Sequence, residues 1–403
     1  MSRRLRPVLF SALIVAVGAR YVVGLATGSM GDFLVYRQAG IAVEGQGSLY
    51  TSGDTLPFTY PPFAALVYAP FAGLGTGWAR WLHTAFGAAL LIWVLVALRR
   101  HLRVPLPLVV ATALTMPFIR SLQLGQVNPL IFALLVTDWV VLSRRAGFLT
   151  GLAAGLKVTP AAFGIVALLR RDWRAASAAA LAFSVTVGLG ALVRPQDTWA
   201  FWTSYLWDPR RVGSLGYADN QSLKGALLRL GVDSVGPYAV LAAATLAVGL
   251  LAARRQTRAD ERVGALVAVG ALGALVSPIS WSHHWLWTPV FALWLWRAGR
   301  RPAAVMAIAV ASIAPVWTAE RLIAVGVQPG LLYAMLTSPF VIIGLVSLVA
   351  LCRPPGLSST GEPGSASRAG EPIPISRAPL CHSTARSQSS PRSSRSNASS
   401  WWA

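Results

Sequence analysis

Apolar runs of about 20 residues recur along this chain of 403 residues, and short arginine clusters separate them. Hydrophobic residues make up 55% of the chain and charged residues only 12%. Because an α-helix rises about 1.5 Å per residue, each such run is long enough to cross the ~30 Å hydrocarbon core of a bilayer. The sequence therefore predicts an all-α, multi-pass integral membrane protein with a lipid bilayer as its surroundings.

The net charge of +21 has the same explanation. The basic residues lie in short clusters between apolar runs and not along one face, so nucleic acid is not expected as a partner. Lys and Arg near span ends concentrate on the cytoplasmic side of the membrane. The clusters assigned to that side are 3–6, 99–103, 144–145, 170–174, 254–262 and 297–301.

This charge map predicts about ten full crossings and a long outer segment, 29–77, after the first span. Within that segment, Asp32 to Val43 has the spacing of an interfacial helix, and Pro61 to Phe71 is a short interfacial or re-entrant piece. The expected spans are Val8–Gly28, Trp78–Leu98, Val104–Phe118, a return span ending at Leu142, Ala175–Val193, Pro237–Ala253, Val263–Val276, Trp285–Trp296, Ala303–Ala319 and Leu331–Cys352.

The stretch Phe148 to Leu169 has basic clusters at both ends and so must enter and leave on one side. A re-entrant hairpin broken at Lys157–Pro160 satisfies this condition. One membrane domain, 1–352, is expected. From Arg353 to Ala403 the chain is rich in Ser, Pro and Arg, which predicts a disordered cytoplasmic tail.

Most of the acidic residues that precede the tail fall on the outer side of this map, and Asp32 follows the first span directly. Polar patches near the same side carry amides, hydroxyls and aromatic rings. Aromatic faces stack on sugar rings, and amide groups both donate hydrogen bonds to sugar hydroxyls and accept them. A carboxylate can take a proton from an attacking hydroxyl. These patches are 31–36 with 58–62, 125–128, 220–225 and 277–285.

The same residues resemble a known family. An aspartate after the first span, Tyr-Pro-Pro (60–62), Gly-Gln-Val-Asn (125–128), Lys-Val-Thr-Pro (157–160), Asn-Gln-Ser-Leu (220–223) and Ser-Pro-Ile-Ser-Trp-Ser-His-His (277–284) occur in order. This pattern is similar to glycosyltransferase family 87, actinobacterial GT-C membrane enzymes that take a sugar from a polyprenyl phosphate. The resemblance covers roughly residues 8 to 350.

The resemblance implies a plasma-membrane enzyme whose active site faces the extracytoplasmic side, with Asp32 as the general base of an inverting transfer. A phosphate leaves as a stable anion, so no second carboxylic acid is needed. The departing phosphate does need cations and hydrogen-bond donors around it. The expected donor-phosphate ligands are Lys157, His283, His284 and Arg120. The expected sugar or acceptor contacts are Tyr36, Tyr60, Gln126, Asn128, Asn220, Gln221 and Trp281.

Structural alternatives remain open for several of these residues. Asp32 is also suited to cap a helix, with Asp54 as the competing base. Lys157 is also suited to snorkel from a short helix, and Asn220–Gln221 is also suited to close a loop. The Trp199–Trp207 segment fits an interfacial belt as well as a glycan platform.

The resemblance implies a mannosyltransferase that uses polyprenyl-phosphate mannose and a glycan or glycolipid acceptor. No Asp-X-Asp triplet occurs, which favours a lipid-linked donor over a nucleotide sugar; no cofactor and no metal are expected. An arabinofuranosyltransferase using a polyprenyl-phosphate pentose is the alternative within the family. A transporter or lipid flippase is the alternative of another class.

Overall fold

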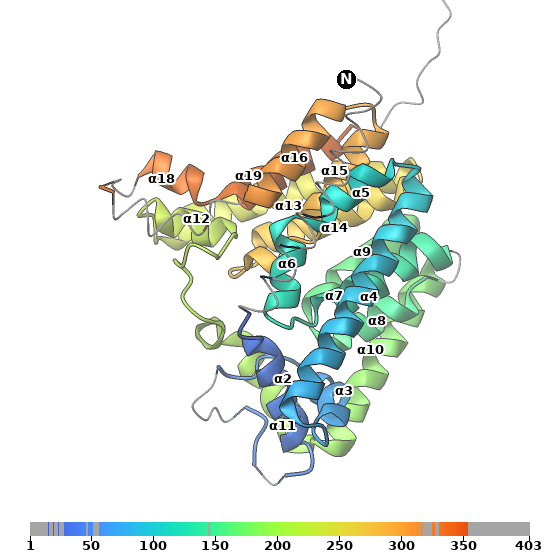
Figure 1. The fold of residues 1–403 in the computed structure, drawn as a ribbon, viewed down its shortest axis with the longest axis vertical. Coiled ribbons are helices and arrows are strands. Elements are labelled where there is room, and N and C mark those ends of the chain that lie inside the picture. The colour runs from blue at the N-terminus through green and yellow to red at the C-terminus, as the bar shows by residue number, and fades with distance from the viewer. Residues whose placement is uncertain are drawn as a thin grey trace, which may run out of the picture. The chain divides into compact units, whose positions relative to one another are not determined.

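The computed structural model of the chain describes residues 28–45, 47–50, 56–143, 146–313 and 330–353, with a few isolated positions besides. The regular structure in these residues is helical, with one strand-type bridge between Asn220 and Trp281. The predicted all-α class is confirmed (Figure 1). The predicted first span and the predicted tail lie outside the described residues, apart from single positions, and so does Asp54.

The helices of the first half begin with α2, where the sequence predicted a helix over Asp32 to Val43. In chain order they are α2 (Gly31–Ala42), α3 (Pro62–Tyr68), the 3-10 turn η1 (Ala69–Phe71), α4 (Thr76–Leu102), α5 (Leu106–Ala113), α6 (Met116–Gln123), α7 (Asn128–Val136), the π-helix η2 (Thr137–Leu142), α8 (Phe148–Leu156), η4 (Thr159–Phe163) and α9 (Gly164–Arg170).

The second half starts with a long helix and ends with two short ones. Its elements are α10 (Trp173–Val193), α11 (Pro195–Thr203), η5 (Tyr205–Trp207), η6 (Pro209–Val212), α12 (Leu223–Arg229), α13 (Val235–Arg258), α14 (Arg262–Val276), η7 (Ser282–His284), α15 (Trp287–Arg297), α16 (Arg301–Ile313), α18 (Leu331–Leu336) and α19 (Pro339–Leu351).

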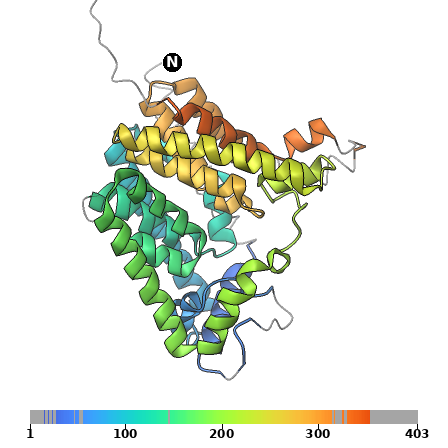
Figure 2. The same cartoon turned by 180° about the vertical axis from the view of Figure 1, so that it is seen from behind.

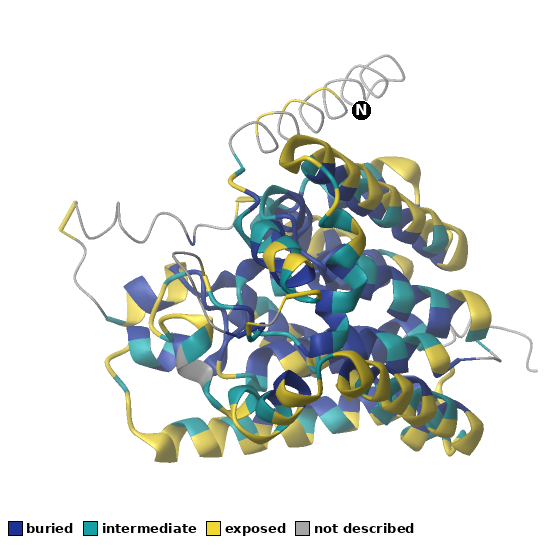
Figure 3. Cartoon of the chain, turned by 90° about the horizontal axis from the view of Figure 1, so that it is seen from below, coloured by how far each residue is buried: buried dark blue, intermediate teal, exposed yellow. Residues whose placement is uncertain are grey.

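Three helices of the described chain, α4, α10 and α13, are long and apolar enough to cross a membrane. The pair α5 and α6, which bends by 48°, makes a fourth if it is one span. The count is lower than the ten crossings predicted from the sequence, because several expected spans are shorter or broken helices. Exposed apolar side chains such as Trp81 and Ile92 on α4, and Leu181 on α10, identify lipid-facing surfaces (Figure 3).

Two expected spans are broken at a proline. Val104–Phe118 was predicted as one helix, but α5 ends at Ala113 and α6 begins at Met116, with Pro117 in its first turn. Leu331–Cys352 is divided in the same way, and Pro339 begins α19. Proline lacks a backbone N–H and clashes with the preceding turn, so it is tolerated only where a helix starts. The chain also breaks between Leu156 and Thr159, where the hairpin break was predicted.

The helices form two groups that pack together (Figure 2). One group contains α4, α7, α8 and α10, and the other contains α13 to α16 and α19. The short helices α2, α3 and α11 lie near the start of α4 and the end of α10 (Figure 1). The segment 29–77 and the first part of 194–236, as far as Arg211, therefore meet at one end of the bundle; both segments were predicted to be external.

Polar side chains join these two segments. Arg194 donates to the carbonyls of Gly45 and Gly47 and pairs with Asp197 at 2.8 Å. Asp197 in turn accepts from the Ser48 hydroxyl at 2.6 Å. This largely buried pair holds the loop after α2 against the start of α11.

Candidate active site

A cavity of about 550 Å³ lies where these segments meet. Most of the side chains that the sequence singled out line it, although they come from distant parts of the chain. These are Asp32, Tyr36, Tyr60, Gln126, Lys157, Trp281, His283 and His284. Arg120, Asn128, Asn220 and Gln221 do not line this cavity.

Asp32 lies in the first turn of α2, where the helix dipole favours a negative charge. It does not cap the helix, because the N-cap residue is Met30 and no side chain caps that end. Its Oδ2 atom accepts a hydrogen bond of 2.6 Å from the Gln126 amide. Burial raises the pKa of Asp32, and the Gln126 hydrogen bond, Lys157 and Arg120 oppose that rise.

The turn after α6 places Gln126 beside Asp32. The backbone N–H groups of Met30 and Phe33 donate to the carbonyls of Gln123 and Leu124, at 3.1 and 3.2 Å. Gly125 has a φ of 64°, and a Cβ atom there would lie 2.5 Å from the Phe33 Cβ. Only glycine fits this approach without strain. The ring of His83 supports the contact, stacked on Phe33 at 4.6 Å with Nε2 3.0 Å from the Gly125 carbonyl oxygen.

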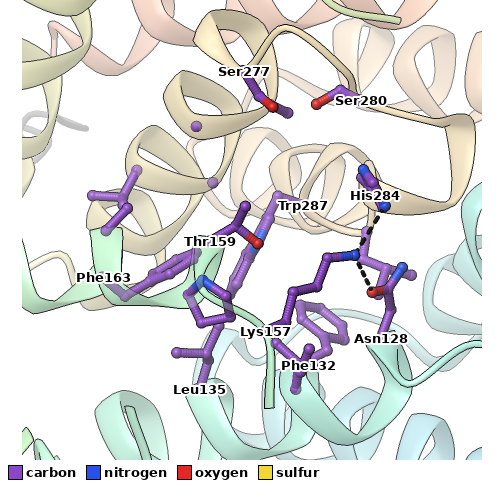
Figure 4. Close-up of a pocket in the computed structure, with 18 of the residues that line it drawn as sticks. Asn128, Phe132, Leu135, Lys157, Thr159, Phe163, Ser277, Ser280, His284 and Trp287 are labelled. Atoms are coloured by element: carbon purple, nitrogen blue, oxygen red, sulfur yellow. Dashed lines mark hydrogen bonds between the residues drawn. The ribbon is translucent and has the colours of Figure 1, made fainter. Parts of the chain in front are cut away.

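Lys157 occupies the break between α8 and η4, in an extended conformation that points its side chain away from both elements. Its Nζ lies 3.0 Å from His284 Nε2, 3.4 Å from Asn128 Oδ1 and 3.5 Å from Tyr60 Oη. Figure 4 shows the first two of these contacts. Burial lowers the pKa of Lys157 to about 8, although the Asp32 charge opposes that fall. The two longer contacts are weak, so the ammonium can still bind a phosphate oxygen.

The two histidines sit in η7, and their rings meet edge to face at 4.6 Å. Burial and the nearby Lys157 charge hold the pKa of both rings well below the usual value, so neutral His284 accepts the Lys157 hydrogen bond. Neither ring nitrogen of His283 has a partner among the described residues, although its side chain is buried and lines the cavity. An unpaired buried imidazole is suited to bind a substrate group.

Asn128 and Arg120 act from behind the cavity wall. Asn128 donates to the His283 carbonyl at 3.0 Å and contacts Lys157 through its side-chain oxygen. Arg120 donates to Gln123 Oε1 at 3.2 Å, and its charge acts on both Asp32 and His283. In this structure both residues therefore support the side chains that were predicted to meet the substrate.

Asn220 and Gln221 hold loops together. The Asn220 amide contacts the carbonyls of Leu215 and Pro278 and accepts from the Ser280 N–H at 2.9 Å. Gln221 donates to the carbonyls of Ala218 and Thr337. These contacts fix the segment that leads to Trp281 and the histidines, which is the loop-closing alternative that the sequence left open.

Arg211 was missed by the sequence analysis. It lines the cavity, its guanidinium lies 4.4 Å from the centre of the Tyr205 ring, and it donates to the Tyr50 carbonyl at 3.0 Å. Asp208 lines the same wall. The signal available in the sequence was an Arg-Arg pair at 210–211 in a loop assigned to the outer side, where basic residues are disfavoured.

No group of three or more His, Cys, Asp or Glu side chains among the residues that the structure describes is placed to hold a metal ion. The cavity brings together a carboxylate held by an amide, a lysine beside two neutral imidazoles, and several aromatic rings. Such a set can take a proton from a hydroxyl and stabilise a departing anion.

These features define a membrane-embedded group-transfer enzyme. The model of glycosyltransferase family 87 matches residues 58–278, and the chain belongs to this family. The predicted family is therefore confirmed, and the protein is a membrane glycosyltransferase.

Curated relatives agree with this assignment. A polyprenol-phosphate-mannose-dependent alpha-(1-2)-phosphatidylinositol pentamannoside mannosyltransferase of Mycolicibacterium smegmatis is 35% identical over 73% of this chain and 76% of its own length. A polyprenol-phosphate-mannose-dependent alpha-(1-2)-phosphatidylinositol mannoside mannosyltransferase of Mycobacterium tuberculosis is 34% identical over 65% of this chain and 67% of its own. No solved structure matches the chain.

Proposed function

We propose that this protein transfers a mannosyl residue from polyprenyl-phosphate mannose to a hydroxyl of an extracytoplasmic glycolipid or glycan, with inversion at the anomeric carbon. The observation that carries the proposal is the placement of Asp32 and Lys157 on one cavity, with the two histidines beside the lysine. The relatives' dependence on polyprenol-phosphate mannose supports the choice of donor.

In the proposed reaction, Asp32 takes the proton of the acceptor hydroxyl as its oxygen attacks the anomeric carbon. The bond from that carbon to the phosphate oxygen breaks on the opposite face, and the polyprenyl phosphate leaves with the electron pair. Lys157 and an N–H of His283 bind the phosphate, because preorganised donors stabilise charge that develops in the transition state. The leaving group is a stable anion, so a second carboxylic acid is not required.

Two apolar cavities that share part of their lining, one of them beside Lys157, are suited to the prenyl chain. The smaller one, of about 110 Å³, is lined by Phe132, Phe163 and Trp287 and reaches Lys157 and His284 (Figure 4). The larger one, of about 650 Å³, is lined mainly by Ala, Gly, Leu and Val from α8, α10, α13 and α14. Ala162 and Gly273 line both. A prenyl chain gains free energy by burial in such surroundings.

The acceptor side of the cavity is proposed to be the wall with Tyr205, Asp208 and Arg211. Ring faces and paired hydrogen-bonding groups bind sugars, and the guanidinium also suits the phosphodiester of a phosphatidylinositol mannoside. The relatives act on phosphatidylinositol mannosides, which supports an acceptor of this chemical class.

We further propose that the enzyme lies in the plasma membrane with this site outside, that residues 1–352 carry the activity and that 353–403 form a cytoplasmic tail. The distribution of arginine supports this orientation. In a chain without native cysteines, Ser214→Cys should react with an impermeant thiol reagent on intact cells, and Arg258→Cys should not. The reverse pattern would invert the orientation.

Asp32→Asn tests the chemistry. The amide keeps the size of the side chain but cannot take a proton, so transfer from polyprenyl-phosphate mannose should fall to background while donor binding persists. Asp208→Asn, which alters another acid of the same cavity, should retain measurable transfer. Wild-type turnover by Asp32→Asn would reject the proposed base.

A further inference from the structure

We infer that Gln126, Tyr36 and Tyr60 form a one-way hydrogen-bond chain from the ammonium of Lys157 to the carboxylate of Asp32, and that they are positioning residues of the transfer reaction. The inference rests on the proposed roles of Asp32 and Lys157. It gives the three side chains a role that differs from the sugar contact expected from the sequence.

The carboxylate end of the chain is well defined. Gln126 Nε2 donates to Asp32 Oδ2 at 2.6 Å, and Gln126 Oε1 lies 3.1 Å from the hydroxyl of Tyr36. An amide oxygen can only accept, so the single hydrogen of the Tyr36 hydroxyl must point at Gln126. That contact fixes which end of the amide faces Asp32.

The direction continues to the lysine. Because the Tyr36 hydrogen is committed to Gln126, the Tyr36 oxygen must accept from the hydroxyl of Tyr60, 2.9 Å away. The Tyr60 oxygen then accepts from Lys157 Nζ, at 3.5 Å, since an ammonium can only donate. Every link therefore points from the cation toward the carboxylate, and each donor polarises the next.

Packing keeps water from replacing the links at the carboxylate end of the chain. Tyr36 is 2% exposed and Gln126 is 4% exposed. The rings of Tyr36 and Tyr60 meet edge to face at 5.0 Å, and Tyr68 packs against Tyr36 at 4.9 Å. The three side chains come from α2, the segment before α3 and the turn after α6, so the chain also ties these elements together.

The chain controls the ionisation of the base. Without the Tyr36 hydroxyl, the Gln126 amide is free to rotate and to present its oxygen to Asp32. An oxygen in that position stabilises the protonated carboxyl group, so the pKa of Asp32, already raised by burial, should rise further. A smaller fraction of the enzyme would then hold an ionised base at neutral pH, and activity would return at higher pH.

The test compares Tyr36→Phe and Tyr60→Phe with the wild type as the full-length protein in nanodiscs, with polyprenyl-phosphate mannose as the donor. For Tyr36→Phe, kcat at neutral pH should fall about tenfold or more, because small displacements of a catalytic group are costly. The acid limb of the kcat profile should move to higher pH in Tyr36→Phe, and by a smaller amount in Tyr60→Phe, in which the Tyr36 hydroxyl still donates to Gln126. The KM for the donor should change little. Tyr68→Phe, which removes a hydroxyl from the same aromatic cluster, should keep the wild-type profile.

An acid limb that stays in place in both variants would overturn the inference, because loss of packing lowers activity equally at all pH values. The outcome is separable from the proposed function. If Asp32→Asn is inactive and both phenylalanine variants behave as the wild type, only the chain is rejected. If Asp32→Asn is fully active, the proposed base is rejected, and with it the chain.

Discussion

Asp32 Oδ2 and Gln126 Nε2 lie 2.6 Å apart, although 94 residues separate them in the chain. The contact exists because the turn at Gly125 docks on the first turn of α2 through two backbone hydrogen bonds. It gives a half-buried carboxylate a donor that opposes the cost of burial. The geometry of the proposed base therefore depends on a turn that carries no catalytic group.

Replacing that donor by a second acid should weaken the base. In Gln126→Glu, two carboxylates would share one buried position, and the repulsion between them raises one pKa strongly. We expect the acid limb of kcat to move to higher pH and activity at neutral pH to fall, by about tenfold for each unit by which the pKa comes to exceed the assay pH. The measurement is the pH dependence of mannosyl transfer.

The matched control is Gln38→Glu, which adds the same charge at an exposed position of α2, the helix that carries Asp32. It should leave the acid limb in place. Equal shifts in the two variants would mean that general charge, and not the contact with Asp32, sets the pKa.

The ionisation of Lys157 should determine how kcat/KM for the donor falls at alkaline pH. Its pKa is lowered to about 8, so the ammonium is present below that pH and is lost above it. In the wild type, kcat/KM for the donor should therefore fall as pH rises through about 8, since this parameter reports the free enzyme.

In Lys157→Arg the guanidinium stays charged throughout this range, so the alkaline fall should disappear. Activity at neutral pH should also decrease, because a planar fork does not reproduce the contacts of an ammonium. An unchanged alkaline limb in Lys157→Arg would assign that limb to another group.

Gly125→Ala should damage both stability and catalysis. The new Cβ would meet the Phe33 Cβ at 2.5 Å in a backbone with φ of 64°. Alanine at a positive φ costs about 1 kcal/mol or more, and the clash adds to this. We expect a lower Tm and a lower kcat. Gly188→Ala, in α10 with nothing within 4 Å of the added Cβ, should not lower the Tm. Equal effects of the two changes on Tm and kcat would contradict the view that the turn at Gly125 positions Gln126 beside Asp32.

The sequence predicted local features well, and the long-range ones incompletely. The helices α2, α4, α10 and α13 and the break at Lys157 follow from hydrophobic spacing, charge and proline, which act over a few residues. Most of the chemically suited residues do converge on one cavity. Their contacts could not be predicted, because Asp32, Gln126 and Lys157 meet only through the packing of separate elements.

The limits of the sequence have physical causes. Spans were drawn through Pro117 and Pro339 because hydropathy averages over a window and does not register the missing N–H of one residue. A substrate contact by Asn220 and Gln221 stays a prediction, because an amide that binds a sugar and one that binds a backbone carbonyl have the same sequence signature. Arg211 was taken as part of an aromatic loop, although a basic pair in a loop predicted to be external was itself unusual.

Ala162→Phe should distinguish recognition of the prenyl chain of the donor from recognition of its sugar. Ala162 lines both apolar cavities, so a phenyl ring there would obstruct the proposed path of the prenyl chain without touching Asp32 or Lys157. The KM for a long-chain polyprenyl-phosphate mannose should rise on the order of tenfold or more, as expected when several buried methylene groups are displaced. The variant should use a donor with only two isoprene units as efficiently as the wild type does.

Val185→Phe, at an exposed position of α10, is the control and should not discriminate between the donors. Equal use of both donors by Ala162→Phe would place the prenyl chain elsewhere on the helices.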